Sequence, residues 1–106
     1  MTSKDKIIKK IIQIADKAHP DSSVILYGSQ ARGDSNEHSD WDLLILLNQK
    51  SLSFEQETKI MDEYYELELS EDIIISPLVY TQAEWNSKYA SIPLHKNIDK
   101  EGLKIL

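Results

Sequence analysis

The stretch "LYGSQARGDSNEHSDWDLLILL", residues 26–47, joins a glycine-serine turn to an apolar segment that opens with two aspartates. The segment "DLLILL" (42–47) is apolar on both faces, which is typical of a central strand covered on both sides. Such strands rarely begin with two negative charges, as this one does at Asp40 and Asp42. We therefore expect the two aspartates to have a chemical role, and the turn before them to share it.

Helical and strand patterns alternate on both sides of this stretch. Residues 4–18 carry apolar side chains at helical spacing and end before Pro20, and "SVILY" (23–27) predicts a strand. Capping-box patterns predict helices that begin at Ser53 and at Thr81, the first reaching about residue 69. Between them "DIIISPLVY" (72–80) predicts a strand that is bulged or at an edge, because Pro77 cannot donate a hydrogen bond.

The last part of the chain predicts shorter elements. Pro93 is expected to interrupt the helix that follows Thr81, and Gly102 to stop one last turn before "LKIL" (103–106). That final apolar segment extends a sheet or meets a partner, and the residues do not decide between the two. The overall order predicts an α/β (α+β) fold with a small mixed β-sheet flanked by helices.

Composition limits the classes of function. With 106 residues the chain predicts one domain, 1–106. A net charge of −6 disfavours nucleic-acid binding, which needs many phosphates to be neutralised. The lysines of residues 4–17 are expected to be a solvated helix face. There is no cysteine, no apolar run of membrane-spanning length and no signal-peptide pattern, so a cytoplasmic location is expected.

The two aspartates suggest a metal site. Residues two apart in a strand point to the same face, so Asp40 and Asp42 project together about 6.6 Å apart along the chain. At the mouth of an apolar strand their repulsion is relieved by a divalent cation, and oxygen ligands favour Mg²⁺ or Mn²⁺. Alternatively, both aspartates are turn residues that simply precede the strand.

The turn "YGSQARG" (27–33) suggests an anion site. Gly28 allows the backbone to approach a phosphate closely, and Ser29 adds a hydroxyl. Arg32 is the single arginine of the chain and binds phosphate well, although it could equally pair with Asp34 or Glu37. "GSQARGDS" is not a P-loop, because Asp34 stands at the lysine position and would repel phosphates.

Gly28-Ser29, ten residues and Asp40-Trp41-Asp42 together give the pattern G-S-x10-D-x-D. This pattern resembles the nucleotidyltransferase superfamily of polymerase-β type, and specifically its minimal nucleotidyltransferase members. The resemblance spans roughly residues 5–85 and implies a polymerase-β-like fold. It also implies that Gly28 and Ser29 bind the β- and γ-phosphates of a nucleoside triphosphate, and that Asp40 and Asp42 bind two Mg²⁺ (or Mn²⁺) ions.

Active members of the family add a third carboxylate from a neighbouring strand. The match of "LVYTQAEW" (78–85) to the family pattern puts Ser76 at that position, and a serine hydroxyl is a weak, neutral ligand. Asp72 lies about 13 Å earlier along an extended strand. It could replace the missing acid only if the register or a bulge differs.

The resemblance implies transfer of a nucleoside monophosphate from an NTP, with ATP expected, to a hydroxyl acceptor on a partner protein. Minimal nucleotidyltransferases often accompany a small helical HEPN-domain protein as the antitoxin of the pair. The alternative is a catalytically silent nucleotide- or partner-binding module of the same fold, which the serine at position 76 favours. A nucleic-acid end-modifying enzyme is disfavoured by the acidic charge, and a homo-oligomer is left open.

The remaining histidines and aromatic residues have plainer interpretations. His38, two residues before Asp40, is expected to be solvated, although it could contact substrate or metal. His19 and His95 are expected at the surface. Trp41 is expected to point away from the aspartates into the core. Most other aromatic side chains are expected to pack helices on the sheet, namely Phe54, Tyr64, Tyr65, Trp85 and Tyr89.

Overall fold

The computed structural model describes residues 3–33 and 40–106, which form one mixed sheet with helices on both faces. Its helices are α1 (Ser3–Ala18), α2 (Ser29–Arg32), α3 (Phe54–Glu71), α4 (Gln82–Ser87) and α5 (Pro93–Glu101), and its strands are β1 (Ser22–Tyr27), β2 (Trp41–Leu47), β3 (Ile75–Thr81) and β4 (Leu103–Lys104). The strand order is β3-β2-β1-β4, with β2 and β3 parallel and the other pairs antiparallel. The expected α/β fold is confirmed, and Pro77 lies in an edge strand.

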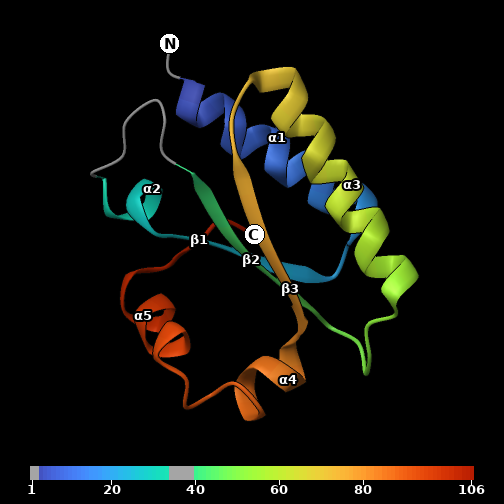
Figure 1. Cartoon of the computed structure of the whole chain (residues 1–106), viewed down its shortest axis with the longest axis vertical. Helices are drawn as coiled ribbons and strands as arrows, with labels where there is room; N and C mark the ends of the chain where they lie inside the picture. Colours follow the sequence, from blue (N-terminus) through green and yellow to red (C-terminus); the bar gives the residue numbers. More distant parts are fainter. Residues whose placement is uncertain (1–2, 34–39) are drawn as a thin grey trace.

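The two faces of the sheet are covered by different helices. Helices α1 and α3 lie on one face, and α4 and α5 lie on the other (Figure 1). Strand β2 is central and buried on both sides, because Leu43, Ile45 and Leu47 face α1 and α3 while Leu44 and Leu46 pack with α4 and α5. The strand beginning at Asp42 is therefore covered on both faces, as its apolar run predicts.

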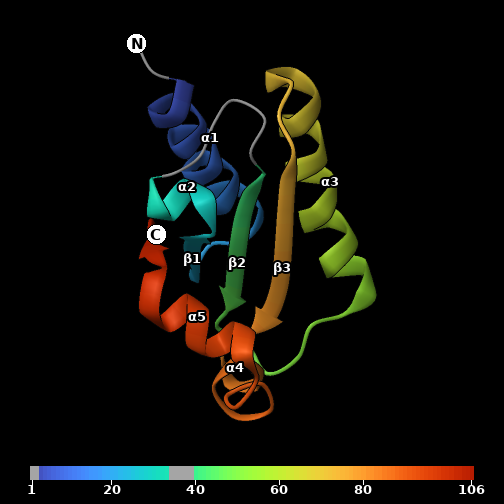
Figure 2. The ribbon, with the colours of Figure 1, turned by 60° about the vertical axis from the view of Figure 1, so that its left-hand side comes forward.

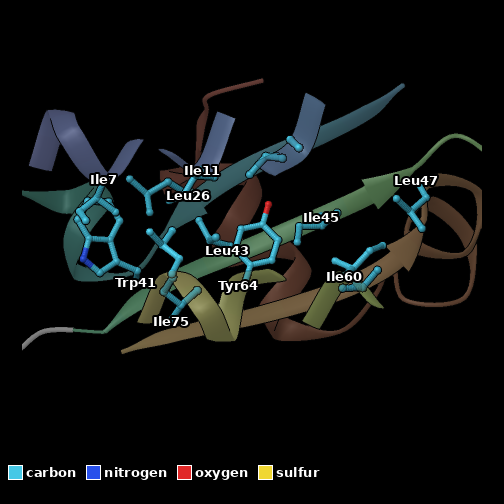
Figure 3. Close-up of a cluster of buried hydrophobic side chains, with 14 residues drawn as sticks. Ile7, Ile11, Leu26, Trp41, Leu43, Ile45, Leu47, Ile60, Tyr64 and Ile75 are labelled. Atoms are coloured by element: carbon cyan, nitrogen blue, oxygen red, sulfur yellow. The ribbon is translucent and has the colours of Figure 1, made fainter. Parts of the chain in front are cut away.

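The larger hydrophobic core lies between the sheet and the α1–α3 layer (Figure 3). Trp41 is only 5% exposed and belongs to this core, so it points away from the side of the sheet that carries Asp42. Tyr64 is the largest fully buried side chain of this layer and comes from the middle of α3. A second, smaller cluster on the opposite face gathers Leu44, Leu46, Trp85 and Ile98.

Helix caps fix the start of α3 and of α4. The Ser53 hydroxyl accepts a hydrogen bond from the Gln56 N–H at 3.1 Å, and the Thr81 hydroxyl accepts one from the Glu84 N–H at 3.2 Å. Both capping patterns therefore define real helix starts. Only the second is reciprocal, since Thr81 also donates to Glu84 Oε1 whereas the Gln56 amide pairs with Gln49.

Two predicted boundaries are wrong, and one question that the sequence leaves open is answered. The third strand begins at Ile75 rather than at residue 72, because α3 continues to Glu71 and ends at Asp72 in a left-handed conformation with φ 55°. Pro93 does not interrupt a helix but begins α5, in the first-turn position where a missing N–H costs nothing. The C-terminal segment extends the sheet, since residues 103–106 form β4 and further backbone hydrogen bonds to Val24 of β1.

Several side-chain expectations are also wrong. His19 is 2% exposed, because its ring is hydrogen-bonded to the Ser22 hydroxyl at 2.7 Å and to the Tyr64 hydroxyl at 2.9 Å. The His95 ring stacks on Trp85, with 4.6 Å between the ring centroids, and is largely buried. Phe54 and Tyr65 do not pack on the sheet but are 84% and 58% exposed.

The lysines of α1 are engaged with neighbouring elements. Lys6 and Lys10 pair with Glu71 at 3.3 Å each, and Lys4 Nζ donates to the Gln30 carbonyl at 2.6 Å. They therefore tie α1 to α3 and to α2 rather than forming a basic patch for phosphates. Of the helices that the structure describes, none is long and apolar enough to span a bilayer.

Candidate functional site

Three polar side chains form a row across the sheet where β1 ends and β2 begins. Asp42 on β2 is paired with Tyr27 on antiparallel β1 and with Ser76 on parallel β3. Paired residues of neighbouring strands point to the same face, so a phenol, a carboxyl and a hydroxyl lie side by side. All three are partly exposed, and the face they share is the one that carries α4 and α5.

Gly28 brings the glycine-serine turn into contact with Asp42. A Cβ built at Gly28 would collide with Asp42 Oδ2, so no larger residue fits against this carboxylate. The backbone of Gly28 also has φ 76° and ψ −157°, a region that is essentially restricted to glycine. Gly28 and Asp42 are fourteen positions apart in the sequence, and glycine is required at position 28 for both reasons.

Helix α2 begins directly at this turn and lies beside the start of β2 (Figure 1; Figure 2). Its first helical hydrogen bonds run from the N–H groups of Ala31 and Arg32 to the Gly28 carbonyl, at 3.1 Å each. The N–H groups of Ser29 and Gln30 therefore precede the helical hydrogen bonds of α2. Ser29, half-buried, begins the helix directly after Gly28.

Burial and neighbouring charges shift the pKa values of two members of the row, Asp42 and Tyr27. Burial, and then the charge of Asp40, raise the pKa of Asp42 above its ordinary value, while Arg32 lowers it. Burial and Asp42 also raise the pKa of Tyr27 to about 12, so this phenol stays protonated at neutral pH. Negative charge at Asp42 is thus disfavoured by its surroundings, and a bound divalent cation would relieve this.

Arg32, the last residue of α2, forms an ion pair with α5. Its Nη1 donates to Glu101 Oε1 at 3.1 Å, so the last residue of α2 is ion-paired with the last residue of α5. Pairing of Arg32 with an acid was expected as an alternative to phosphate binding. The two acids named for it, Asp34 and Glu37, lie outside the described residues, as does His38.

The position where active relatives are expected to carry a third carboxylate is occupied here by the hydroxyl of Ser76. Ser76 lies directly opposite Asp42, at the position where a third acid was sought. Asp72 cannot replace it, because Asp72 is the exposed C-cap of α3 and precedes β3. Among residues 3–33 and 40–106, no group of three or more His, Asp or Glu side chains could hold a metal ion.

Sequence reasoning missed two residues of this site. Tyr27 could have been found, because it is the last residue of the predicted first strand and the alternation of side chains puts it on one face with its partner. Glu101 carried no signal, since it reaches Arg32 from 69 positions later in the chain. Only the packing of α5 across the sheet brings the two together.

A mixed sheet in which a Gly-Ser turn lies against Asp42 at the start of β2, with Asp40 exposed just before the strand, agrees with a nucleotidyltransferase of the α/β class. The chain belongs to the polymerase beta nucleotidyltransferase family, whose model, described as "Polymerase beta, Nucleotidyltransferase", matches residues 9–105. The resemblance that the Gly-Ser and Asp-x-Asp pattern indicated is therefore confirmed.

Individual relatives agree with this family. A protein of Methanocaldococcus jannaschii, named as a protein adenylyltransferase, is 44% identical over 57 residues, which cover 54% of this chain and 57% of the relative. The chain thus aligns with little more than half of that relative. A crystal structure of a toxin-antitoxin with AMP-PNP has a TM-score of 0.68 at 20% identity, covering 93% of this chain and 72% of the other.

A crystal structure of a variant of the MntA-HpeT toxin-antitoxin has a TM-score of 0.64 at 18% identity and covers 93% of this chain and 71% of the other. At these identities the likeness of the solved structures establishes a shared fold. It places the sheet and its flanking helices in the same arrangement as in those toxin-antitoxin proteins.

Proposed function

We propose that residues 1–106 act as one minimal nucleotidyltransferase domain that transfers a nucleoside monophosphate, AMP from ATP, to a hydroxyl group of a partner protein. The observation that carries the proposal is the contact between the Gly28 turn and the Asp42 carboxylate. This contact puts a glycine turn, whose backbone a phosphate could approach, against a carboxylate whose charge a bound cation would stabilise. In the reaction the acceptor hydroxyl loses its proton to solvent and its oxygen bonds to the α-phosphorus. The bond from the α-phosphorus to the oxygen that bridges to the β-phosphorus breaks, and pyrophosphate leaves.

Each residue of the site has a defined task in this proposal. Gly28 and Ser29 bind the β- and γ-phosphates, and Arg32 adds a guanidinium on the same side. Asp40 and Asp42 hold two Mg²⁺ (or Mn²⁺) ions, which when bound neutralise the charge of the reacting phosphates. Tyr27, protonated and paired in register with Asp42, offers a hydrogen-bond donor beside this carboxyl. These groups act by orienting the reactants rather than by covalent chemistry.

The partner is proposed to be a small helical HEPN-like protein, with this chain as the antitoxin and the cytoplasm, where ATP and Mg²⁺ are present, as the location. The structural similarity to toxin-antitoxin proteins, one of them with AMP-PNP, supports this proposal. A relative named as a protein adenylyltransferase supports a protein acceptor and ATP.

The test is transfer of label from α-labelled ATP with Mg²⁺ to the candidate partner protein. We expect labelled partner with the natural protein and with Asp62→Asn, an exposed aspartate of α3 on the other face. We expect none with Asp40→Asn/Asp42→Asn. Equal labelling by the double variant, or metal binding that it does not reduce, would disprove the metal site.

The second candidate is a silent module that binds nucleotide or partner without transfer. It is favoured by one observation, the hydroxyl of Ser76 at the register position opposite Asp42. The variant Ser76→Asp separates the two candidates, because it restores a third carboxylate beside Asp42. If the natural protein is a silent module, it binds Mg-ATP without transferring label, and only the Ser76→Asp variant transfers it. If it is an enzyme, the natural protein with Ser76 already transfers label.

A further inference from the structure

Helix α3 carries a stripe of four apolar side chains along one flank, which we call the α3 stripe. Phe54, Tyr65 and Leu69 are 84%, 58% and 66% exposed, and half-buried Met61 lies between them in the sequence. Their spacing of seven, four and four residues puts all four on one side of the helix. Single exposed apolar side chains are common on protein surfaces, whereas a row of them rimmed by charged residues is typical of a contact with another protein.

The α3 stripe lies on the flank of the helix that faces away from α1. Glu63 and Glu71 mark the flank towards α1, because both pair with lysines of that helix. Tyr65 follows Glu63 by two residues and Leu69 precedes Glu71 by two, which turns each of them about 200° around the helix axis. Figure 2 shows α3 at the margin of the molecule, beside the edge strand β3. The α3 layer covers the face of the sheet opposite Asp42, so the stripe is separate from the candidate site.

Acidic residues border the α3 stripe on both sides. Helix α3 carries seven acidic residues against one lysine, a net charge of −6 that equals the net charge of the whole chain. Within residues 3–33 and 40–106, five of these acids form no ion pair, namely Glu55, Glu57, Asp62, Glu66 and Glu68. At about 100° per residue, Glu55, Asp62 and Glu66 fall on one side of the stripe, and Glu57 and Glu68 fall on the other. The surface therefore has an apolar centre and a negative border.

We propose that the α3 stripe is a docking surface for a helix of a partner protein, one whose apolar side chains are flanked by lysines and arginines. From Phe54 to Leu69 the stripe is about 22 Å long, which matches about four turns of a second helix. Charge complementarity selects a basic partner, since a second copy of this chain would bring two helices of net charge −6 together. A strand added to the β3 edge is disfavoured, because Pro77 offers it no N–H. The inference goes beyond the proposed transfer reaction and does not depend on it.

The probe is a fluorescently labelled amphipathic peptide of about four helical turns, with leucines on one face and lysines on both sides of them. A peptide of the same composition in shuffled order, without an apolar face, measures attraction by charge alone. Fluorescence anisotropy is expected to show about tenfold tighter binding of the ordered peptide to the natural protein. Tyr65→Ser/Leu69→Ser is expected to weaken this binding about tenfold, and Glu66→Gln/Glu68→Gln about two- to fivefold. One border charge alone, as in Asp62→Asn, contributes little.

Two matched controls change the same kinds of residue elsewhere. Leu103→Ser removes an exposed leucine at the opposite edge of the sheet, and Asp16→Asn/Asp99→Asn removes two exposed acids of α1 and α5. Both controls should bind the ordered peptide as the natural protein does, and the exposed positions should leave the urea midpoint of every variant unchanged.

Three results would overturn the inference. The first is unchanged binding by Tyr65→Ser/Leu69→Ser, or an equal loss in the controls. The second is equally tight binding of the shuffled peptide, which would reduce the interaction to charge alone. The third is a dimer of the natural protein in analytical ultracentrifugation that Tyr65→Ser/Leu69→Ser abolishes, because it would assign the stripe to a second copy of this chain.

Discussion

At the scale of single residues, the site depends on how closely Gly28 and Asp42 approach one another. Two requirements coincide at Gly28, a backbone conformation that other residues avoid and a neighbour that leaves no room for a Cβ. The second positive-φ glycine, Gly33, has φ 84° but nothing within 4 Å of its Cβ position. Substitutions at the two glycines therefore distinguish the effect of backbone strain, which both share, from the effect of contact with the carboxylate, which only Gly28 makes.

Gly28→Ala is expected to lower the free energy of unfolding by about 1–3 kcal/mol and to abolish binding of Mg-ATP, because the new methyl group displaces the Asp42 carboxylate. Gly33→Ala is expected to cost about 1–2 kcal/mol and to keep nucleotide binding. Urea denaturation and calorimetric titration with a non-hydrolysable ATP analogue measure the two effects. Retention of nucleotide affinity in Gly28→Ala would refute the importance of this contact.

Asp42 is expected to reduce stability while no metal is bound. Its pKa is raised, so the folded state disfavours the charged form that is present at pH 7, and the protein gains stability as the pH falls through that raised pKa. Asp42→Asn should therefore raise the Tm of the metal-free protein by a few degrees at most, since solvent screens a partly exposed charge. Added Mg-ATP should raise the Tm of the natural protein only. A lower Tm for metal-free Asp42→Asn, against unchanged Asp62→Asn, would contradict this.

At the scale of elements, the buried histidine at the end of α1 links three parts of the fold. His19 follows α1, bonds Ser22 of β1 and reaches Tyr64 in α3. Burial lowers the pKa of His19 below 6.5, so the unfolded chain takes up the proton first as the pH falls. The charged ring is disfavoured in this place, and the contact becomes a source of acid sensitivity.

The free energy of unfolding is expected to decrease as the pH falls below about 6.5, and to be independent of His19 above it. His19→Gln should be less stable at neutral pH but should lose part of this slope. Urea denaturation between pH 5 and 8 measures both. His95→Gln serves as the comparison on the other face, and an identical pH slope in His19→Gln and the natural protein would exclude the mechanism.

The elements also show where sequence reasoning succeeds and where it stops. The Gly28 turn and Asp42 could be placed because turn chemistry and strand alternation are local rules that act over few residues. The position of Ser76 came from the resemblance to the family pattern, and its register opposite Asp42 from the structure. The burial of His19 was not predicted, because Pro20 after it marks the end of a helix, where side chains are usually exposed. Its burial depends on Tyr64, which lies far along the chain. The contact of Glu101 with Arg32 could not be predicted either, because it depends on the packing of distant elements. The start of α5 at Pro93 was missed because proline both ends and begins helices, and only packing decides between the two.

At the scale of the whole molecule, one sheet separates two hydrophobic clusters, each with one tryptophan. Trp41 lies in the cluster under α1 and α3, and Trp85 in the one under α4 and α5. Central β2 contributes side chains to both clusters, so unfolding of either cluster also disrupts the strand that packs in the other.

Single-tryptophan variants are expected to report one common unfolding transition. In Trp85→Phe the fluorescence comes from Trp41, and in Trp41→Phe it comes from Trp85. For each variant the fluorescence midpoint in urea should coincide with that of the helical circular dichroism. A fluorescence midpoint that precedes the dichroism in Trp41→Phe alone would show that the α4–α5 layer unfolds separately.

The pairing of β4 with β1 also has a consequence for synthesis on the ribosome. Strand β1 leaves the ribosome before the residues that cover its outer edge, 103–106, because all of α2 to α5 is synthesised between them. Until then β1 presents unpaired N–H and C=O groups along that edge, the kind of surface on which nascent chains associate. Slow translation of residues 103–106 would prolong this interval, and the same residues that complete the sheet follow directly after Glu101, which pairs with Arg32. The nascent protein therefore gains its protected edge and the contact between α5 and α2 in a single step.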